Sequence, residues 1–291
     1  GIEFSVSADV IHSKSFKWNT QFNIATQRNR VLALASGIDY LLGGEEMNMT
    51  VVGKSIGQLY LYKTKGIDPE TGRRIYVANV NGQEVDVLCK YEKSGKFFRK
   101  DDGTLVSQSN LVQDICGNTM PTYYGGWTND LTYKNWGLSV LMQYSGGNKI
   151  YNGTTATTSD MRYWNNTKDV LHKYWKQAGD VAKYAYPIYG DNYSNGSALP
   201  ISDWVENGDY LRCKQVTLSY NFDTSKWSKK IGVSSLRVYA SATNLFCITG
   251  YSGLDPESLI SDNGQAALQG GIDKNCLPQA RTYTFGVNIG F

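Results

Sequence analysis

Apolar and polar residues alternate in several stretches of this chain, and the last eleven residues show the pattern most clearly. They read RTYTFGVNIGF, with Tyr283, Phe285, Val287, Ile289 and Phe291 at every second position. A period of two predicts a β-strand with one apolar and one polar face. A terminal strand that ends on Phe is typical of bacterial outer-membrane barrels, although an edge strand of a secreted β-sandwich has the same pattern.

The same alternation predicts six further amphipathic strands. They cover residues 1–12, 16–27, 123–133, 136–144, 209–222 and 236–246. Short turns at 13–15 and 134–135 join two pairs of them into antiparallel hairpins. In 209–222 the alternation puts Arg212 and Lys214 on the apolar face, near the beginning of the strand. Cations are tolerated at the rim of a membrane, where lipopolysaccharide phosphates could pair with them.

The region 28–121 is irregular by comparison. It contains one expected strand, 56–63, a GIDPETG turn at 66–72 and a hairpin signal at Asn81-Gly82, because Asn-Gly tolerates the positive φ angles of a type I′ turn. Four acidic residues lie in these turns: Asp68, Glu70, Asp101 and Asp102. Solvated turns are favoured over a Ca²⁺ site, because the ordered carboxylate spacing of a calcium loop is missing.

A second long excursion, 146–208, is rich in aromatic residues. Thr167 is expected to cap a short helix in which Val170, Leu171, Tyr174 and Trp175 share a face. Aromatic rings among Asn, Asp and Gly suit stacking on sugars or gripping a peptide, and they equally suit a loop that packs on itself. The candidates for substrate or partner contact are Tyr163, Trp164, Tyr174, Trp175, Tyr186 and Tyr189.

Composition narrows the fold class. Only 41% of residues are hydrophobic and the mean hydropathy is −0.39, and no run reaches the ~18 apolar residues that a spanning helix needs. A barrel stays polar on average, because alternation hides its apolar band. A net charge of +3 is too weak to argue for nucleic acid. We therefore expect an all-β transmembrane antiparallel barrel with long extracellular loops.

Catalytic and metal-binding patterns are missing. The five cysteines show no CxxC pair, so no metal site is expected, and an odd count leaves one thiol free. An export compartment would permit bridges such as Cys89 to Cys116 or Cys247 to Cys276. With two histidines and no GxSxG, HExxH, P-loop or Rossmann pattern, we expect neither an enzyme nor a cofactor.

Loop lengths predict the orientation. In outer-membrane barrels short turns face the periplasm and long loops face outside. Excursions 28–121 and 146–208 are then largely extracellular, 28–121 holds either no spanning strand or an even number, and Phe291 ends in the periplasm. Gly1 enters from outside, as would the product of a nick in an exposed loop. Seven strands leave two open edges, which another segment of the same protein must pair.

The alternation also assigns side chains to faces. Lumen-facing candidates are Gln143, Gln215, Ser219 and Tyr239. An aromatic girdle at the membrane edges is expected from Trp18, Trp127, Tyr133, Trp136, Phe222 and Phe291, although a sandwich core would need the same residues.

Several ordered motifs resemble one known family over residues 1–291. The segments YKNWGLSVLMQYSGGNKIYN, WVENGDYLRCKQVTLSYNF, LRVYASATNLFCITGYSGLDPE and RTYTFGVNIGF, together with GIDPETG, look like the C-terminal barrel of SusC/RagA-type TonB-linked transporters of Bacteroidetes. Cys213 and Cys247 depart from the apolar or small residues expected there. The plug domain and the TonB-binding segment of that family are absent from this sequence.

The resemblance implies the C-terminal part of a plugged barrel of about 22 strands. It also implies active import of oligosaccharides or peptides across the outer membrane, with a SusD-like surface lipoprotein over the mouth and TonB pulling on the plug. Two alternatives stay open. One is a TonB-dependent siderophore or cobalamin receptor, and the other is a secreted, soluble glycan-binding β-sandwich.

Overall fold

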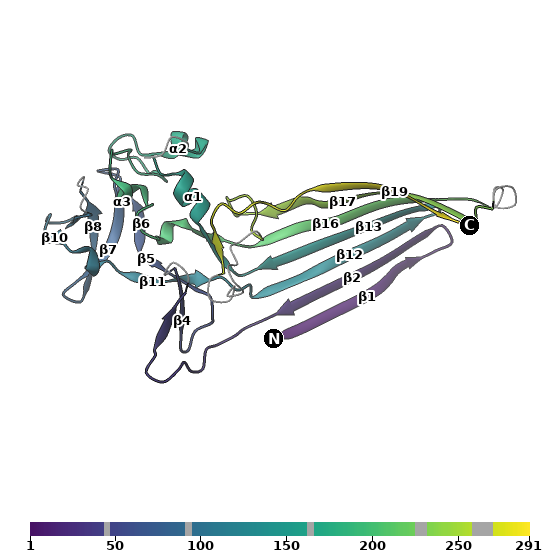
Figure 1. Ribbon diagram of the computed structural model, residues 1–291, viewed down its shortest axis with the longest axis horizontal. Coiled ribbons are helices and arrows are strands. Elements are labelled where there is room, and N and C mark those ends of the chain that lie inside the picture. Colours follow the sequence, from purple (N-terminus) through teal and green to yellow (C-terminus); the bar gives the residue numbers. More distant parts are fainter. Residues whose placement is uncertain (44–46, 91–94, 162–165, 225–231, 258–269) are drawn as a thin grey trace.

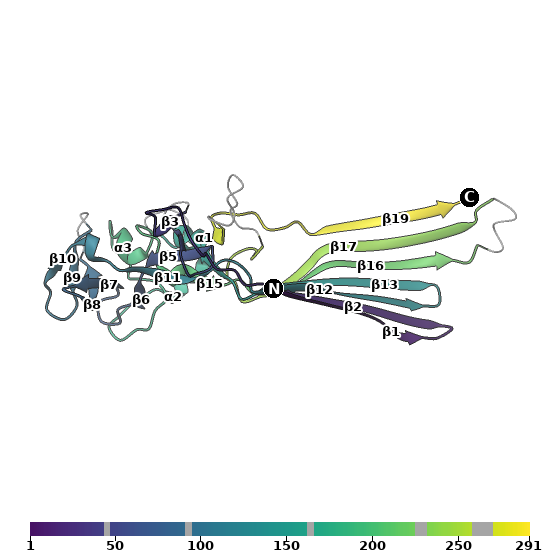
Figure 2. The same cartoon turned by 90° about the horizontal axis from the view of Figure 1, so that it is seen from below.

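A computed structural model describes residues 1–43, 47–90, 95–161, 166–224, 232–257 and 270–291. A long antiparallel sheet extends from one side of a compact region of short strands and helices (Figures 1 and 2). We call this compact region the head; it comprises the described residues of 27–122, 147–209 and 250–281. Among the residues that the structure describes, no helix is long and apolar enough to cross a membrane.

The long sheet has seven strands in chain order, and each pairs with the next in antiparallel fashion. They are β1 (Ile2–His12), β2 (Phe16–Thr26), β12 (Tyr123–Tyr133), β13 (Trp136–Gly146), β16 (Tyr210–Phe222), β17 (Ser235–Thr249) and β19 (Thr282–Gly290). All seven predicted strands are confirmed, with bounds that differ from the predicted ones by three residues or fewer. β1 and β19 are the open edges.

The two ends of the sheet differ in their connections. The turns at 13–15 and 134–135 and the connection 223–234 lie at the end far from the head, and the three longest connections, 27–122, 147–209 and 250–281, lie at the head (Figure 1). Gly1 lies at the head end, whereas Phe291 lies at the short-turn end (Figure 1). The predicted alternation of strand directions is therefore confirmed.

One face of the long sheet is apolar and uncovered. The register aligns Leu131, Leu138 and Leu218 across β12, β13 and β16. Leu218 is 45% exposed and Ile289 is 51% exposed. A β-sandwich would bury these residues beneath a second sheet, and no second sheet of the described residues covers them. The sandwich alternative is therefore wrong for this chain.

The head contains three smaller sheets. β11 (Gln113–Asn118), β5 (Gln58–Tyr62), β4 (Asn48–Val51) and β3 (Tyr40–Leu42) form a four-stranded sheet in this order. β10 (Leu105–Val106), β9 (Phe97–Arg99), β8 (Gln83–Cys89), β7 (Arg74–Val80) and β6 (Thr64–Ile67) form a five-stranded one. The third consists of β15 (Val205–Asn207), β14 (Lys149–Asn152) and β18 (Ile272–Asp273).

Short helices complete the head. They are α1 (Gly153–Thr158), α2 (Lys168–Lys173) and α3 (Asn192–Asn195), with 3-10 turns at Gln108–Asn110 and Ser202–Trp204. α2 begins after Thr167 as predicted, but the Thr167 side chain makes no capping hydrogen bond. The predicted shared face is wrong, because Val170 is buried while Leu171 is 69% exposed and Trp175 lies beyond the helix.

The hydrophobic core lies in the head. Leu59, Tyr76, Phe97 and Trp204 are at its centre, and all are 2% exposed or less. The region 28–121 is thus a folded unit rather than an irregular one, and none of its described strands joins the long sheet. This agrees with the prediction of no spanning strand or an even number.

The predicted turns of this region are confirmed. Asn81 and Gly82 have φ angles of 53° and 83° between β7 and β8, as a type I′ hairpin requires. In the 66–72 turn the Gly72 N–H donates to the Asp68 carbonyl at 2.9 Å. The expected solvation of Asp68 is wrong, because its side chain is fully buried and pairs with Lys100 at 2.8 Å.

The Asp68 turn is also held by charge. Burial alone would raise the pKa of Asp68, but the Lys100 ammonium and the Thr71 hydroxyl hold it below its ordinary value.

All five cysteines are free, so neither bridge considered above forms. Within the described ranges, no group of three or more His, Cys, Asp or Glu side chains could hold a metal ion.

Candidate functional site

The polar face of the long sheet carries the four residues predicted to face a lumen. Ser219 pairs with Tyr239 across β16 and β17, and Gln215 pairs with Leu141, which is two residues from Gln143 on β13. These positions therefore share one face. A Cβ on Gly286 would overlap the Tyr239 ring, so the ring lies directly over this glycine of β19. That this face lines a lumen stays a prediction.

A β-bulge changes the predicted facing of Arg212. The register of β16 against both neighbours shifts between Cys213 and Gln215, and Asn244, opposite on β17, has a left-handed φ of 53°. An extra residue reverses the alternation beyond it. Arg212 consequently lies on the polar face and is 4% exposed, so the prediction that it lies on the apolar face beside lipopolysaccharide is wrong.

Arg212 is the centre of an ionic network at the head end of the sheet. Its Nη2 lies 2.5 Å from Asp255 Oδ1, and its Nε pairs with Glu257. Lys214 Nζ lies 3.1 Å from Glu257 Oε2, which corrects the predicted facing of Lys214 as well. The Tyr210 hydroxyl donates to Glu257 at 2.9 Å.

This network balances two cations with two carboxylates in a nearly dry site; the Asp255 side chain is only 3% exposed. Isolated buried charges are costly, so the partners depend strongly on one another. The network fastens residues 253–257 of the last long connection onto the polar face. It contains no free nucleophile or base, and we assign it a structural role at the mouth of the sheet.

Aromatic residues gather on the apolar face near the short turns. Tyr133 lies opposite Trp136, whose ring packs edge-on against Tyr220 at 4.9 Å, and Phe222 packs against Tyr220 at 4.8 Å. Phe291 follows at the end of β19 and is 88% exposed. That these rings form one edge of an aromatic girdle stays a prediction.

Trp18 and Trp127 have a different role on the same face. Trp127 is in the middle of β12, and its Nε1 donates to Thr20 Oγ1 at 2.9 Å. Trp18 Nε1 and Thr20 Oγ1 both donate to Asn129 Oδ1 at 3.0 Å. The indoles thus hydrogen-bond two polar side chains within the apolar face, and the girdle position of Trp18 and Trp127 stays a prediction.

The predicted contact residues of the head divide into two groups. Tyr163 and Trp164 lie outside the described residues. Trp175 Nε1 donates to the Pro69 carbonyl at 2.8 Å, its ring packs edge-on against Tyr186 at 5.6 Å, and a Cβ on Gly72 would overlap it. The loop-packing alternative therefore holds for Trp175, which docks its segment onto the Asp68 turn.

The other aromatic candidates vary in exposure. Tyr174 forms a bridge with Tyr184, so it also takes part in packing of the head. Tyr186 is 44% exposed and Tyr189 is 83% exposed, which leaves these two able to contact a ligand or a partner.

Tyr76 is a core residue of the head and was not a predicted contact. Burial raises the pKa of Tyr76, whose hydroxyl donates to the Tyr193 carbonyl at 2.8 Å, so this tyrosine is neutral.

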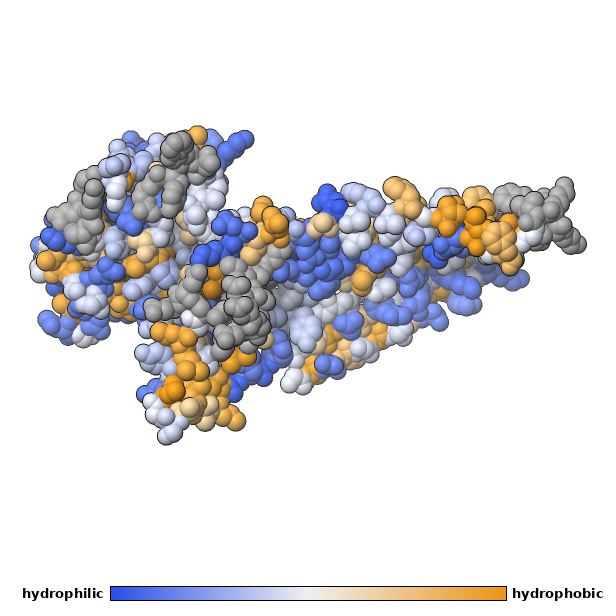
Figure 3. Space-filling model, viewed as in Figure 1, coloured by the Kyte–Doolittle hydropathy of each residue, from blue (hydrophilic) through white to orange (hydrophobic). Residues whose placement is uncertain are grey.

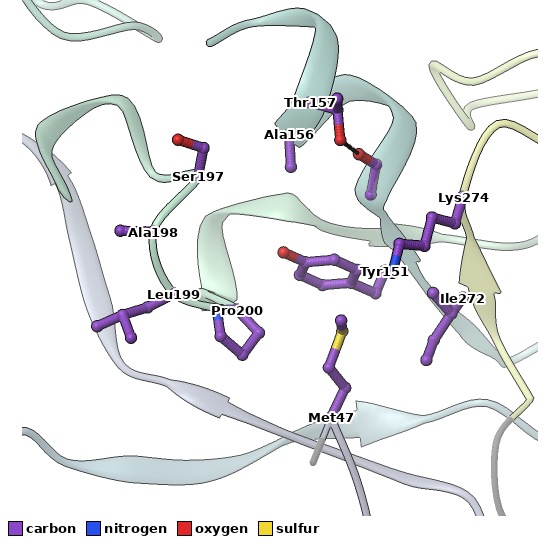
Figure 4. A pocket seen from close by; sticks show the side chains of 11 residues that line it. Met47, Tyr151, Ala156, Thr157, Ser197, Ala198, Leu199, Pro200, Ile272 and Lys274 are labelled. Atoms are coloured by element: carbon purple, nitrogen blue, oxygen red, sulfur yellow. Dashed lines mark hydrogen bonds between the residues drawn. The ribbon is translucent and has the colours of Figure 1, made fainter. Parts of the chain in front are cut away.

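The sequence did not indicate a pocket of about 240 Å³ between α1, β14, β18 and residues 197–200. The Tyr151 ring, Met47 and Ile272 line it from one side and Ala156 and Leu199 from the other (Figure 4). Thr157 and Lys274 add a hydroxyl and an amine (Figure 4). Such a lining suits a small, mostly apolar group with one polar end.

An apolar arm, residues 31–42, projects from the head. It has a single charged residue, Asp39. Leu32 is 83% exposed, Tyr40 52% and Leu42 44%, and Figure 3 shows hydrophobic residues gathered on this projection. Exposed patches of this kind mark interaction surfaces in soluble parts of proteins.

Sequence comparison identifies known proteins that this chain resembles. No family model matches the chain. It is 28% identical over 300 residues to TonB-dependent receptor P3 of Formosa agariphila, and 26% identical over 310 residues to TonB-dependent receptor SusC of Bacteroides thetaiotaomicron. Both alignments cover 100% of the chain. The chain is therefore similar along its full length to TonB-dependent receptors, SusC among them.

The solved structures show the same fold. The RagAB peptide importer in the 'closed-closed' state superposes with a TM-score of 0.74 at 22% identity, over 99% of this chain, and the RagAB peptide transporter gives 0.72 at 20% identity. The chain spans 28% and 26% of the two sequence relatives and 29% of each RagAB chain. These relatives bear the names of receptors and transporters, not of enzymes.

Proposed function

We propose that this chain forms part of the wall and the extracellular loops of an outer-membrane, TonB-dependent importer. The observation that carries the proposal is the two-faced seven-stranded meander with an exposed apolar face and with its three longest connections at one end. In water an exposed apolar face of this kind would promote aggregation, whereas in a bilayer it contacts lipid. The C-terminus then lies in the periplasm and the head lies outside the cell.

In the complete protein the wall would close. β1 and β19 each present an unpaired edge, and such edges are not tolerated in lipid. Further strands of the same protein, up to about 22 in all, would pair them and enclose a plug that TonB pulls from the periplasm. Gln143, Gln215, Ser219 and Tyr239 would then line the lumen around the plug.

The head would meet the substrate and a SusD-like lipoprotein. The proposed cargo is an oligosaccharide or a peptide; the RagAB neighbours are named as peptide importers, and aromatic residues serve both ligand classes. Tyr186 and Tyr189 are the described aromatic candidates for these contacts. The siderophore or cobalamin receptor shares the barrel, but the sequence relatives include SusC.

The test uses the full-length protein in its native membrane. We expect it in the outer-membrane fraction, copurifying with a SusD-like lipoprotein and required for uptake of peptides or oligosaccharides. The variant Y186A/Y189A should reduce uptake or lipoprotein binding, with Leu277→Ala as the control, because Leu277 is 84% exposed and is not a predicted contact. Recovery in the soluble fraction would refute the proposal, and siderophore uptake without a lipoprotein would favour the alternative receptor.

A further inference from the structure

Hydrogen bonds clamp residues 29–31, where the arm begins, to residues 53–56, which follow β4 and close the base of the arm. Asn29 Oδ1 accepts from Ser55 Oγ at 2.8 Å and from the Ile56 N–H at 2.9 Å. The Val31 N–H donates to the Lys54 carbonyl, and the Gly53 N–H donates to the Val31 carbonyl, both at 2.8 Å. Residues 29–31 are therefore fixed against residues 53–56.

This clamp brings three cations to one cavity. Arg28, Arg30 and Lys54 line a cavity of about 560 Å³, and none of its lining residues is acidic. None of the three cations forms an ion pair within the described part of the chain. The Arg30 guanidinium lies beside Gly53, within van der Waals distance of where a Cβ on Gly53 would lie. Neighbouring Asn118 and Thr122 add polar groups.

Three unpaired cations in one cavity repel one another, and an anion would relieve that repulsion. Guanidinium groups bind the oxygens of phosphate in a bidentate manner, and a lysine adds a point charge. The cavity is large enough for a phosphate ester, and apart from Met120 and Pro121 its remaining lining is polar or glycine. We propose that Arg28, Arg30 and Lys54 form a binding site for a phosphate group.

The position of the site indicates where the phosphate comes from. The Gln27 N–H donates to the Thr122 carbonyl at 3.0 Å, just after the last residue of β2 and just before the first residue of β12. The cavity therefore begins where the amphipathic strands end, which in the proposed barrel is the level of the outer-leaflet headgroups. Lipopolysaccharide phosphates lie there, and this site replaces Arg212 as their partner; this assignment rests on the proposed outer-membrane location.

The experiment uses the full-length protein with the variant R28Q/R30Q/K54Q. The control K14Q/K17Q/K134Q removes the same charge at the other end of the sheet. One arm measures binding of inorganic phosphate to the protein in detergent. The other measures retention of lipopolysaccharide, intact or enzymatically dephosphorylated, on protein in nanodiscs. We expect the site variant to weaken phosphate-dependent binding by about tenfold or more, because charge-assisted contacts are lost, while the control stays near wild type.

The outcomes separate the sources. If the site variant loses only the binding of intact lipopolysaccharide, the site exists and its phosphate comes from a lipid. If the site variant loses the binding of inorganic phosphate and still retains lipopolysaccharide like wild type, the site exists and its phosphate comes from a soluble molecule. Equal binding by both variants, or no phosphate-dependent binding by wild type, overturns the site. Such a failure would leave outer-membrane fractionation and uptake unchanged, so it is distinct from failure of the proposed function.

Discussion

The ionic network around Arg212 makes the sharpest prediction about the head end of the long sheet. Arg212→Met keeps much of the side-chain volume but leaves Asp255 and Glu257 without their principal cation in a site that is almost dry. Removing one partner of a buried ion pair costs about 3–5 kcal/mol. Since about 1.4 kcal/mol is tenfold in an equilibrium constant, local opening of residues 253–257 should become roughly two to four orders of magnitude more frequent.

Hydrogen exchange measured by mass spectrometry on the full-length protein reports this opening. The amides of Glu257 and Gln279 donate to the Asp255 carboxylate at 2.9 and 3.0 Å, so peptides that contain them should lose protection in Arg212→Met. Arg237→Met is the control, because Arg237 is an exposed cation of the same face at the opposite end of β17. Wild-type protection in Arg212→Met, or equal loss in the control, would refute the reasoning.

Three further predictions concern other parts of the chain. Gly286→Ala should lower stability by about 1–3 kcal/mol, seen as a lower melting temperature, because the new Cβ overlaps Tyr239; unchanged melting would contradict this packing. Asn129→Ala should cost about 1–2 kcal/mol in denaturant unfolding, since two donors lose their shared acceptor; a neutral effect would show that lipid or water replaces it. The pKa of Asp68 is depressed by Lys100, so its stabilisation is full above pH 3.8 and is lost as pH falls through the lower folded pKa. Asp68→Asn should flatten this acid-induced loss in a pH titration of unfolding.

Alternation predicted the long sheet well because most positions on one face of each of its seven strands are apolar. A shift of the pairing register by one residue would move every apolar side chain of a strand to the opposite face. The alternation therefore defines both the strand and its register. It failed at Arg212 because a bulge adds one residue, and nothing in LRCKQV marks where the reversal occurs. On the neighbouring strand β17, Asn244 has a positive φ beside the bulge, a conformation that Asn tolerates better than most residues.

The head was harder to predict because its order comes from distant contacts. Its strands have two to seven residues, too few for a period to be visible. Trp175 was expected to meet a ligand or pack, and it packs because Gly72, about a hundred residues earlier, leaves room for its ring. The basic site could have been noticed as RNR at 28–30, but Lys54 joins it only through the clamp that closes the arm.

The central claim is that one face of the long sheet meets lipid and the other meets an enclosed aqueous interior. Single spin labels at successive positions of β19, from Thr284 to Ile289, in full-length protein without its native cysteines and reconstituted in lipid, test it directly. Collision rates with oxygen, which dissolves in lipid, should be high at Phe285, Val287 and Ile289, and those with a water-soluble nickel chelate should be high at Thr284 and Asn288. Uniform accessibility to the nickel chelate along the strand, or the opposite phase, would contradict the account.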